Sequence, residues 1–372
     1  MHVVICGGGV IGASSAYFLS QRGVDVTVVE RTAVACAASG KSGGFLALDW
    51  CDGSALEPLA RRSFTLHGDL AAELGGEAWG YRRLDTYSVV ASTQQPVDAY
   101  RRMPSPDWLG DAAAIHAQLG SEQTTAQVDP AAFTGAMMGA AVANGARLEI
   151  GTVTGLLFGG AGATVTGVRV DEREMAADAV LIALGPWTVL AGAWLPLPPV
   201  HGLKGVSLVF DYAPDDVRAL FVGLQTDGRD GASPEVFPRP DGTTYVCGLS
   251  STAPLPVDPA DVHPDTGADE ELRALIAAFA PELAAAPVLR AGACYRPVTA
   301  DALPLIGAVP GITGAYVASG HNVWGMLNGP ATGEAMAELI VDGAATTVGL
   351  AAFDLARLPA LDPAELQVTA RQ

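Results

Sequence analysis

Three glycines near the start of the chain have the spacing that points most directly to chemistry. Gly7, Gly9 and Gly12 form a G-x-G-x-x-G turn after the apolar residues 3–6, and Glu30 ends a second apolar run 18 positions after Gly12. Such a turn lets the backbone approach a pyrophosphate, the next helix offers free N–H groups to the phosphates, and an acid at this spacing accepts hydrogen bonds from a ribose diol. The stretch predicts a dinucleotide site, because an ordinary glycine-rich turn leaves Glu30 unexplained.

A run of small residues at 33–44 contains too few large apolar side chains to build a core element. We expect this run to bring backbone N–H groups and small side chains close to a large, flat ligand. The run follows the second strand, which ends on Glu30, and it begins at the edge of the sheet where such a ligand binds. A flexible surface loop is the alternative interpretation.

The composition argues against several classes of partner. Among 372 residues, 40 are acidic and 21 are basic, which gives a formal net charge of −19. Nucleic acids and anionic membranes need clustered Lys and Arg, so neither is expected, whereas one buried Arg suffices for an anionic substrate. No membrane span or targeting segment is predicted, and the expected location is the cytoplasm. The five dispersed cysteines and six histidines form no disulfide framework and no metal motif.

The sequence around the glycine turn predicts a parallel sheet that is covered by helices. Asp129 and Pro130 predict an N-cap and first turn for one of these helices, and Gly145 and Gly343 predict two helix ends. Strands are expected at 3–6, 24–29, 147–150, 178–184 and 315–318, and helices at 13–21, 54–74, 130–144, 326–342 and after Gly185.

A second group of segments predicts an antiparallel sheet with few helices. Strands are expected within 81–93 and at 203–210, 235–238, 243–249 and 288–296, with helices at 111–119, 215–220 and 268–279 and a β-hairpin turning at 159–162. The fold class is therefore α/β, with a Rossmann-like domain interleaved with a second domain. We assign residues 1–80, 128–198 and 290–372 to the first domain, and 81–127 and 199–289 to a substrate domain built on the antiparallel sheet.

Four motifs together resemble the FAD-dependent amine and amino-acid oxidases, the family of glycine oxidase, monomeric sarcosine oxidase and D-amino acid oxidase or dehydrogenase. They are the glycine unit ending at Glu30, ASGKSGG at 38–44, AVLIALGPW at 179–187, and the C-terminal pair CYRPVTADALPLIG (294–307) and SGHNVWGMLNGPATGEAMAELI (319–340). The C-terminal pair separates this family from nicotinamide-dependent enzymes. The resemblance therefore implies FAD rather than NAD and makes the first domain an FAD-binding domain.

The resemblance also implies a set of cofactor-binding residues. In the C-terminal motif at 319–340, backbone N–H groups are expected to stabilise negative charge on the reduced flavin. The set comprises Gly7, Gly9, Val10, Ile11, Gly12, Glu30, Arg31, Ser39, Gly40, Lys41, Ser42, Gly43, Gly44, Val153, Gly185, Trp187, Cys294, Gly320, Asn322, Val323, Trp324, Gly325, Met326 and Leu327.

Two residues are candidates for a catalytic role. Arg296 stands where glycine oxidase-like enzymes carry the arginine that pairs with the substrate carboxylate, and a guanidinium can hold a carboxylate through two parallel hydrogen bonds. A structural ion pair is the alternative. His321 lies in the loop expected beside the flavin, where it contacts the ring or only packs.

Cys294 is a candidate covalent anchor for FAD, because sarcosine oxidase-like enzymes have a flavin-bonded cysteine at this place in the motif. A buried small residue is the alternative, since the link needs a thiolate.

Two positions depart from the family pattern. Val246 is aligned with the lysine that helps reduced flavin react with oxygen, and Glu235 with a tyrosine near the substrate carboxylate. Lys204, another lysine near the expected site, is predicted to be structural or an edge contact rather than catalytic.

The sequence thus predicts an FAD-dependent enzyme that oxidises the C–N bond of a small amine or amino acid to an imine. The expected substrates are D-amino acids, glycine or N-methyl amino acids, with hydride passing to flavin N5. Oxygen or another electron acceptor would reoxidise the cofactor. The alternatives are an FAD-dependent 2-hydroxy acid dehydrogenase, which needs a base such as His321, and a flavin-binding assembly protein without turnover.

Overall fold

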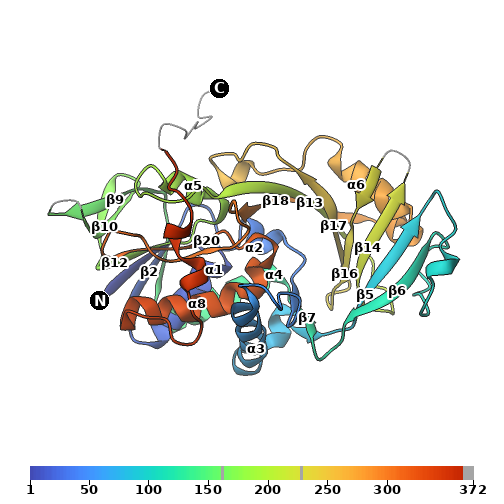
Figure 1. The fold of residues 1–372 in the computed structure, drawn as a ribbon, viewed down its shortest axis with the longest axis horizontal. Coiled ribbons are helices and arrows are strands. Elements are labelled where there is room, and N and C mark those ends of the chain that lie inside the picture. The colour runs from blue at the N-terminus through green and yellow to red at the C-terminus, as the bar shows by residue number, and fades with distance from the viewer. Residues whose placement is uncertain (161–162, 227–228, 363–372) are drawn as a thin grey trace.

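A six-stranded sheet forms the frame around the glycine turn in the computed structural model, which describes residues 1–160, 163–226 and 229–362 (Figure 1). Its strand order is β19-β20-β12-β1-β2-β8, and every neighbouring pair is parallel except β19–β20. The strands are β1 (His2–Cys6), β2 (Asp25–Glu30), β8 (Arg147–Ile150), β12 (Ala179–Ile182), β19 (Leu305–Ala308) and β20 (Ala315–Ser319). The prediction of parallel strands here is confirmed, since Val3 pairs with Ala179 and Cys6 with Ile182.

Residues 3–6 of β1 are apolar because both faces of this sheet are covered. Val3 and Ile5 belong to a core shared with four helices, whereas Val4 and Cys6 belong to a second core against the three-stranded sheet β11-β10-β9. The helices are α1 (Val10–Gln21), α3 (Glu57–Leu74), α4 (Pro130–Ala143) and α8 (Gly325–Asp342), and the strands are β9 (Val153–Gly159), β10 (Thr164–Val170) and β11 (Arg173–Ala176).

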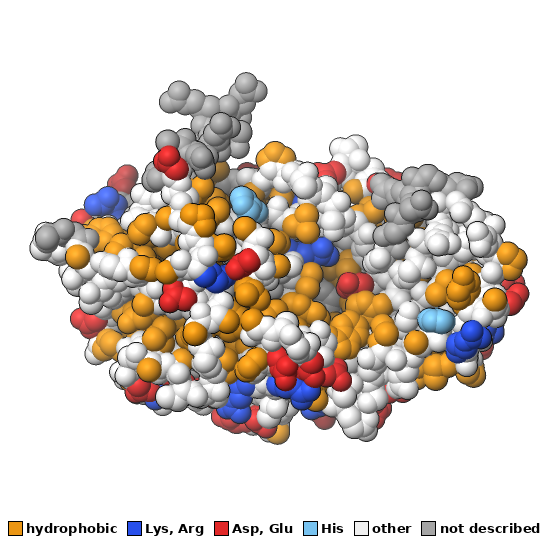
Figure 2. Space-filling model, viewed as in Figure 1, with side chains coloured by type: hydrophobic (Ala, Val, Ile, Leu, Met, Phe, Trp, Pro, Cys, Tyr) orange, Lys and Arg blue, Asp and Glu red, His pale blue; other side chains and the backbone are white. Residues whose placement is uncertain are grey.

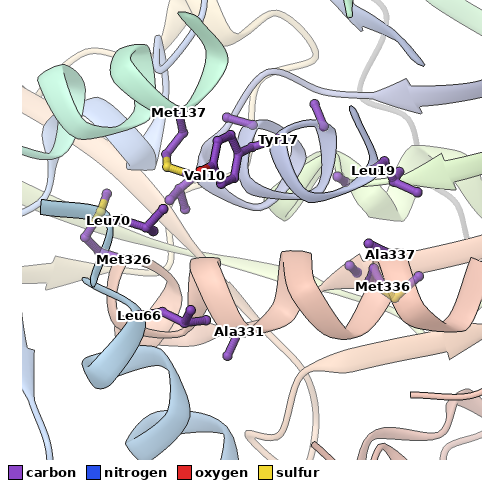
Figure 3. Close-up of a cluster of buried hydrophobic side chains, with 14 of the residues drawn as sticks. Val10, Tyr17, Leu19, Leu66, Leu70, Met137, Met326, Ala331, Met336 and Ala337 are labelled. Carbon is purple, nitrogen blue, oxygen red and sulfur yellow. The ribbon is translucent and has the colours of Figure 1, made fainter. Parts of the chain in front are cut away.

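Helix α8 approaches α1 at two glycines. A Cβ atom on Gly333 would lie 2.5 Å from the carbonyl carbon of Ser14, and one on Gly329 would lie 2.8 Å from a methyl group of Val10. Figure 3 shows the side chains that fill the core around these helices, among them Val10, Tyr17, Leu66, Met137, Ala331 and Met336.

The predicted helix ends in this part are confirmed. The Asp129 side chain accepts a hydrogen bond of 2.8 Å from the backbone N–H of Ala132 and so caps α4. Gly145 and Gly343 follow α4 and α8 with positive φ angles of 101° and 82°, which glycine adopts without strain. Among the described residues, no helix combines the length and apolar character that crossing a membrane requires.

An antiparallel sheet with one parallel pair occupies the other half of the molecule (Figure 1). Its order is β18-β13-β17-β16-β14-β5-β6, with β15 beside β14, and α6 and α7 contribute to its core. The elements are β5 (Thr86–Ser92), β6 (Ala113–Gly120), β13 (His201–Phe210), β14 (Ala219–Thr226), β15 (Arg229–Ala232), β16 (Glu235–Pro238), β17 (Thr244–Ser251), β18 (Val288–Val298), α6 (Ala268–Ala277) and α7 (Pro281–Ala285).

Short elements connect the two halves. A three-stranded sheet has the order β3-β7-β4. One short helix lies within the 38–44 motif, and another follows the 179–187 motif. These elements are β3 (Phe45–Ala47), β4 (Arg82–Arg83), β7 (Thr125–Gln127), α2 (Ala38–Lys41) and α5 (Thr188–Ala191).

The period-two alternation of the antiparallel sheet gives its two faces different roles. Leu220, Val236 and Val246 are buried in the core that includes α6. Their chain neighbours Phe237 and Tyr245 belong to a different cluster on the opposite face.

Two predicted helices are wrong. Residues 111–119 contain β6, which pairs antiparallel with β5 and buries Ala113 and Ile115. Residues 215–220 lead into β14, which pairs with both β5 and β16. In both cases pairing with a neighbouring strand overrides a weak local preference for helix. The predicted hairpin is present as β9 and β10, although residues 161–162 of its turn lie outside the described residues.

We predict that Gly333→Ala destabilises the protein by about 1–3 kcal/mol, because the new methyl group would collide with the backbone of α1. Gly139→Ala on the exposed face of α4 is the matched control. No atom lies within 4 Å of its added Cβ, so this change should stabilise the protein by up to about 1 kcal/mol. Denaturant unfolding of the two variants checks this, and equal effects of the two substitutions would refute the packing account.

Candidate active site

A cavity of about 420 Å³ lies where the parallel sheet meets the antiparallel sheet, and residues from both line it. Figure 2 shows a hollow on this face of the molecule, bordered by hydrophobic side chains and containing an acidic and a basic group. The volume is in the range typical of small-molecule sites.

The acid at the end of β2 closes one end of the cavity. Glu30 is buried, and its carboxylate accepts hydrogen bonds from the backbone N–H groups of Gly8 at 2.7 Å and Thr32 at 2.9 Å. These bonds hold the carboxylate beside the glycine turn, with lone pairs left for a hydroxyl-bearing ligand.

The glycine turn leaves no room for side chains on its inner side. A Cβ on Gly7 would lie 2.4 Å from the carbonyl oxygen of Ala183, and one on Gly12 would lie 2.0 Å from that of Gly7. The first N–H of α1, on Val10, donates to Ser39 Oγ at 2.9 Å and so ties the turn to the small-residue run. This arrangement explains the spacing seen in the sequence.

The small-residue run is attached to the antiparallel sheet. The Tyr245 hydroxyl donates to the carbonyl oxygen of Lys41 at 3.1 Å, and the buried guanidinium of Arg239 donates to that of Ser42 at 3.3 Å. A Cβ on Gly43 would lie 2.5 Å from the ring of Phe237, so the backbone rests directly on this ring. The run is therefore a positioned part of the site rather than a free loop, and residues 38–41 form the helical turn α2.

Aromatic rings form one wall of the cavity, and among them only Trp324 belongs to the residues predicted from the sequence. Phe45 lies with its ring centroid 4.9 Å from that of Trp50, 5.0 Å from Phe221 and 5.6 Å from Phe237. Trp50 and Trp324 meet edge to face at 6.5 Å. The one available signal was Phe45, which follows the small-residue run directly.

The antiparallel sheet contributes the polar groups of this part of the cavity. Arg296 on β18 donates to Ser250 Oγ at 3.1 Å, and Glu235 on β16 stands opposite Cys247 on β17. The Cys247 thiol lies 3.5 Å from a carboxylate oxygen of Glu235. Burial raises the pKa of Glu235, and the Arg296 guanidinium acts against this shift.

Val246, the position aligned with the oxygen-activating lysine, does not face the cavity. Val246 is fully buried in the core on the opposite face of β17, while Tyr245 and Cys247 face the cavity. Lys204 is structural as predicted, since its ammonium group is paired with Asp265.

The start of α8 closes the cavity from the parallel-sheet side. His321 is buried, and its Nε2 lies 3.1 Å from the Thr332 hydroxyl. Burial lowers the pKa of His321 to about 3, so the ring is neutral at physiological pH. Asn322 adopts a positive φ of 52°, a conformation that Asn tolerates better than most residues.

Most of the residues predicted to form the site line this one cavity. Those that do are Gly7, Gly9, Val10, Ile11, Glu30, Arg31, Ser39, Ser42, Gly43, Gly44, Val153, Gly185, Trp187, Cys294, Arg296, His321, Asn322, Val323, Trp324, Gly325 and Met326. Gly12, Gly40, Lys41, Gly320 and Leu327 are not among the lining residues. Gly12 and Gly40 pack against backbone carbonyl groups, and the Leu327 side chain is buried in the helical core.

No group of three or more His, Cys, Asp and Glu residues suited to a metal ion occurs among the described residues.

Comparison with known proteins identifies the family. Residues 2–339 match the family described as FAD dependent oxidoreductase. The chain is 33% identical to a protein of Schizosaccharomyces pombe named as an oxidoreductase, over 95% of this chain and 97% of the relative. It is 29% identical to the glycine oxidase of Geobacillus kaustophilus, over 95% and 96%. The crystal structure of glycine oxidase from that organism matches with a TM-score of 0.77 at 26% identity, over 95% and 97%.

The chain therefore belongs to the FAD-dependent oxidoreductases, and its cavity fits this cofactor. Gly7 and Gly12 permit the tight turn and the close backbone packing of a dinucleotide-binding motif, and Glu30 stands at the end of β2. The buried hydroxyl of Ser42 lines the cavity and has no hydrogen-bond partner among the described residues, which leaves it available to a ligand. The prediction of FAD rather than NAD is supported by the family match.

We predict that two buried histidines make the protein sensitive to acid. Burial lowers the pKa of His321 from 6.5 to about 3 and that of His67 to about 4. Below pH 6.5 the unfolded chain binds protons that the folded chain does not, so stability is full above this pH and falls as the pH drops towards 3. Each ring contributes up to about 1.4 kcal/mol per pH unit.

Denaturant unfolding between pH 7.5 and 5 checks this prediction. The His321→Asn variant should have a shallower pH dependence by about one proton, because its unfolded chain no longer takes up this proton. His67→Gln tests the second ring in the same way. Slopes equal to that of the wild type in both variants would show that other groups cause the acid sensitivity.

Proposed function

We propose that this enzyme oxidises the C–N bond of a small amine or amino acid to an imine. The observation that carries the proposal is the place of Arg296, which lines an aromatic cavity continuous with the glycine turn and Glu30. A cofactor and a carboxylate-bearing substrate can thus share one cavity. The kinship with glycine oxidase supports the same substrate class.

The proposed FAD-binding domain comprises residues 1–80, 128–198 and 290–372, and the substrate domain comprises 81–127 and 199–289. The glycine turn, Glu30 and Ser42 would hold the dinucleotide part, and the loop before α8 would contact the flavin part. FAD supplies the two-electron acceptor for the oxidation when it is bound.

Arg296 is proposed to bind the substrate carboxylate. Its guanidinium is anchored by Ser250 at one nitrogen, which leaves the other donors for a planar acid. The rings of Phe45, Trp50 and Phe221 surround this region with apolar surface, and exclusion of water strengthens the charge-assisted hydrogen bonds.

The state of His321 favours an amine over a 2-hydroxy acid as substrate. Oxidation of an alcohol needs a base for the hydroxyl proton, and a base works best when its pKa lies near the working pH. Burial lowers the pKa of His321 to about 3, and its Nε2 already lies 3.1 Å from Thr332. His321 is therefore proposed to orient the loop before α8, and oxygen or another acceptor is proposed to complete turnover.

Anaerobic mixing of the holoenzyme with candidate substrates tests the function. Glycine, N-methylglycine and D-alanine represent amines, and lactate represents hydroxy acids. We expect at least one amine and not lactate to bleach the flavin absorbance. Bleaching by lactate alone would establish a 2-hydroxy acid dehydrogenase instead. If no compound bleaches the flavin, a flavin-binding protein without turnover is favoured.

The Arg296→Leu variant is the matched test of substrate binding. Loss of the guanidinium should raise KM for the active amine by about 30-fold or more, because a buried charge partner contributes about 2–5 kcal/mol. An unchanged KM would exclude Arg296 as the carboxylate ligand.

We also propose that FAD is bound without a covalent link to Cys294. The link needs a thiolate, and burial raises the pKa of Cys294 although Arg296 and Lys41 oppose the shift. After precipitation of the protein with acid, we expect FAD in the supernatant and a colourless pellet. A yellow pellet that turns colourless in the Cys294→Ala variant would demonstrate the covalent link instead.

A further inference from the structure

Glu235 brings an acid into the cavity on the antiparallel sheet, the sheet that also carries Arg296. It is a residue of β16, paired across the sheet with Phe221 on one side and with Cys247 on the other. All three line the cavity, as does Arg296. A basic and an acidic group therefore border the same volume, within the wall of aromatic rings.

The contacts of Glu235 leave its carboxylate available to a ligand. Among the described residues it accepts a hydrogen bond from the Cys247 thiol at 3.5 Å, and a thiol is a weak donor. Arg296 donates to a different neighbour, Ser250, and forms no direct ion pair with Glu235 among the described residues. The guanidinium acts on the Glu235 carboxylate through space and opposes the rise of its pKa.

The chemistry of the proposed substrate matches this pair of groups. An amino acid carries a carboxylate next to an ammonium group, which complements a guanidinium next to a carboxylate. The amine must lose a proton before it can be oxidised, because the nitrogen lone pair drives removal of hydride from the neighbouring carbon. In water near neutral pH, an aliphatic amine is almost entirely protonated.

We propose that Glu235 binds the protonated amine of the substrate and accepts one proton from it before the oxidation. The substrate ammonium and the Glu235 carboxylate become a neutral amine and a neutral carboxylic acid, and no electrons are exchanged in this step. The inference rests on the proposed function and adds to it a base at the substrate nitrogen.

The surroundings of Glu235 favour this proton transfer. Burial raises its pKa, which makes the carboxylate a stronger base, while Arg296 limits the shift. The other titratable groups that face this region are Cys247, Tyr245 and Cys294, and burial raises the pKa of each of them, so they remain neutral. Among the described residues, Arg296 is thus the charged side chain that acts on the pKa of Glu235.

The first test measures binding and needs no turnover. Glycine betaine and 3,3-dimethylbutanoate have nearly the same shape and the same carboxylate, but only the former carries a positive nitrogen. Titration of the holoenzyme, followed by the flavin spectrum, should show tighter binding of betaine by about tenfold or more, the effect of a close charge pair in a cavity. Glu235→Gln should abolish this preference, and Glu235→Asp should retain part of it.

A wild-type holoenzyme that binds the two compounds equally, or binds neither, overturns the proposal. So does a preference for betaine that survives in Glu235→Gln. The FAD content and the flavin spectrum of each variant show whether it has folded around its cofactor.

The second test measures the pH dependence of anaerobic flavin reduction by the amine that bleaches the wild type. Glu235→Gln should reduce the rate at pH 7 by about 100-fold or more, the typical contribution of a positioned base. The rate should recover above about pH 10, where the solution itself supplies neutral amine. A purely structural defect would not recover with pH.

Two results would overturn the role of Glu235 in proton transfer. In one, flavin reduction in Glu235→Gln is as fast as in the wild type at pH 7. In the other, it stays slow at every pH. If no amine bleaches even the wild type, the proposed function fails, while the binding test still decides whether Glu235 recognises a cation.

Discussion

The site depends on the contact between the small-residue run and the aromatic face of the antiparallel sheet. Gly43 rests on Phe237, and the carbonyl groups of Lys41 and Ser42 accept hydrogen bonds from Tyr245 and Arg239. The run also accepts the first N–H of α1 through Ser39. One short segment therefore fixes the glycine turn relative to the sheet that carries Arg296. A side chain at position 43 would push the two parts of the cavity apart.

Few charged side chains line this cavity. The chain carries a formal net charge of −19, yet the groups that line the cavity are mostly apolar or backbone. Its charged side chains include Glu30 and Arg31 beside the glycine turn, and Glu235 and Arg296 on the antiparallel sheet. Where such a space is desolvated, each charge acts strongly on a ligand, because little water screens it.

The parallel-sheet part could be predicted from local patterns because its rules are local. The apolar run of β1, the glycines and Glu30 belong to one continuous stretch, and caps such as Asp129 act within a few residues. The family resemblance added the FAD assignment, which the family match supports. The antiparallel part was less accessible. Segments 111–119 and 215–220 contain or lead into strands β6 and β14, because neighbouring strands offer hydrogen bonds that no local signal reveals.

By itself, the sequence determined the dinucleotide turn, the order of strands and helices around it and the kinship with flavoenzymes. Only the tertiary structure decided which face of each antiparallel strand lines the cavity. Both faces of β17 are buried, so apolar and small residues follow one another without a polar side to mark the surface. A shift of one residue exchanges the two faces. Val246 consequently packs in the core, while Cys247 and its partner Glu235 face the cavity, a distinction that depends on how the sheet is covered rather than on residue type.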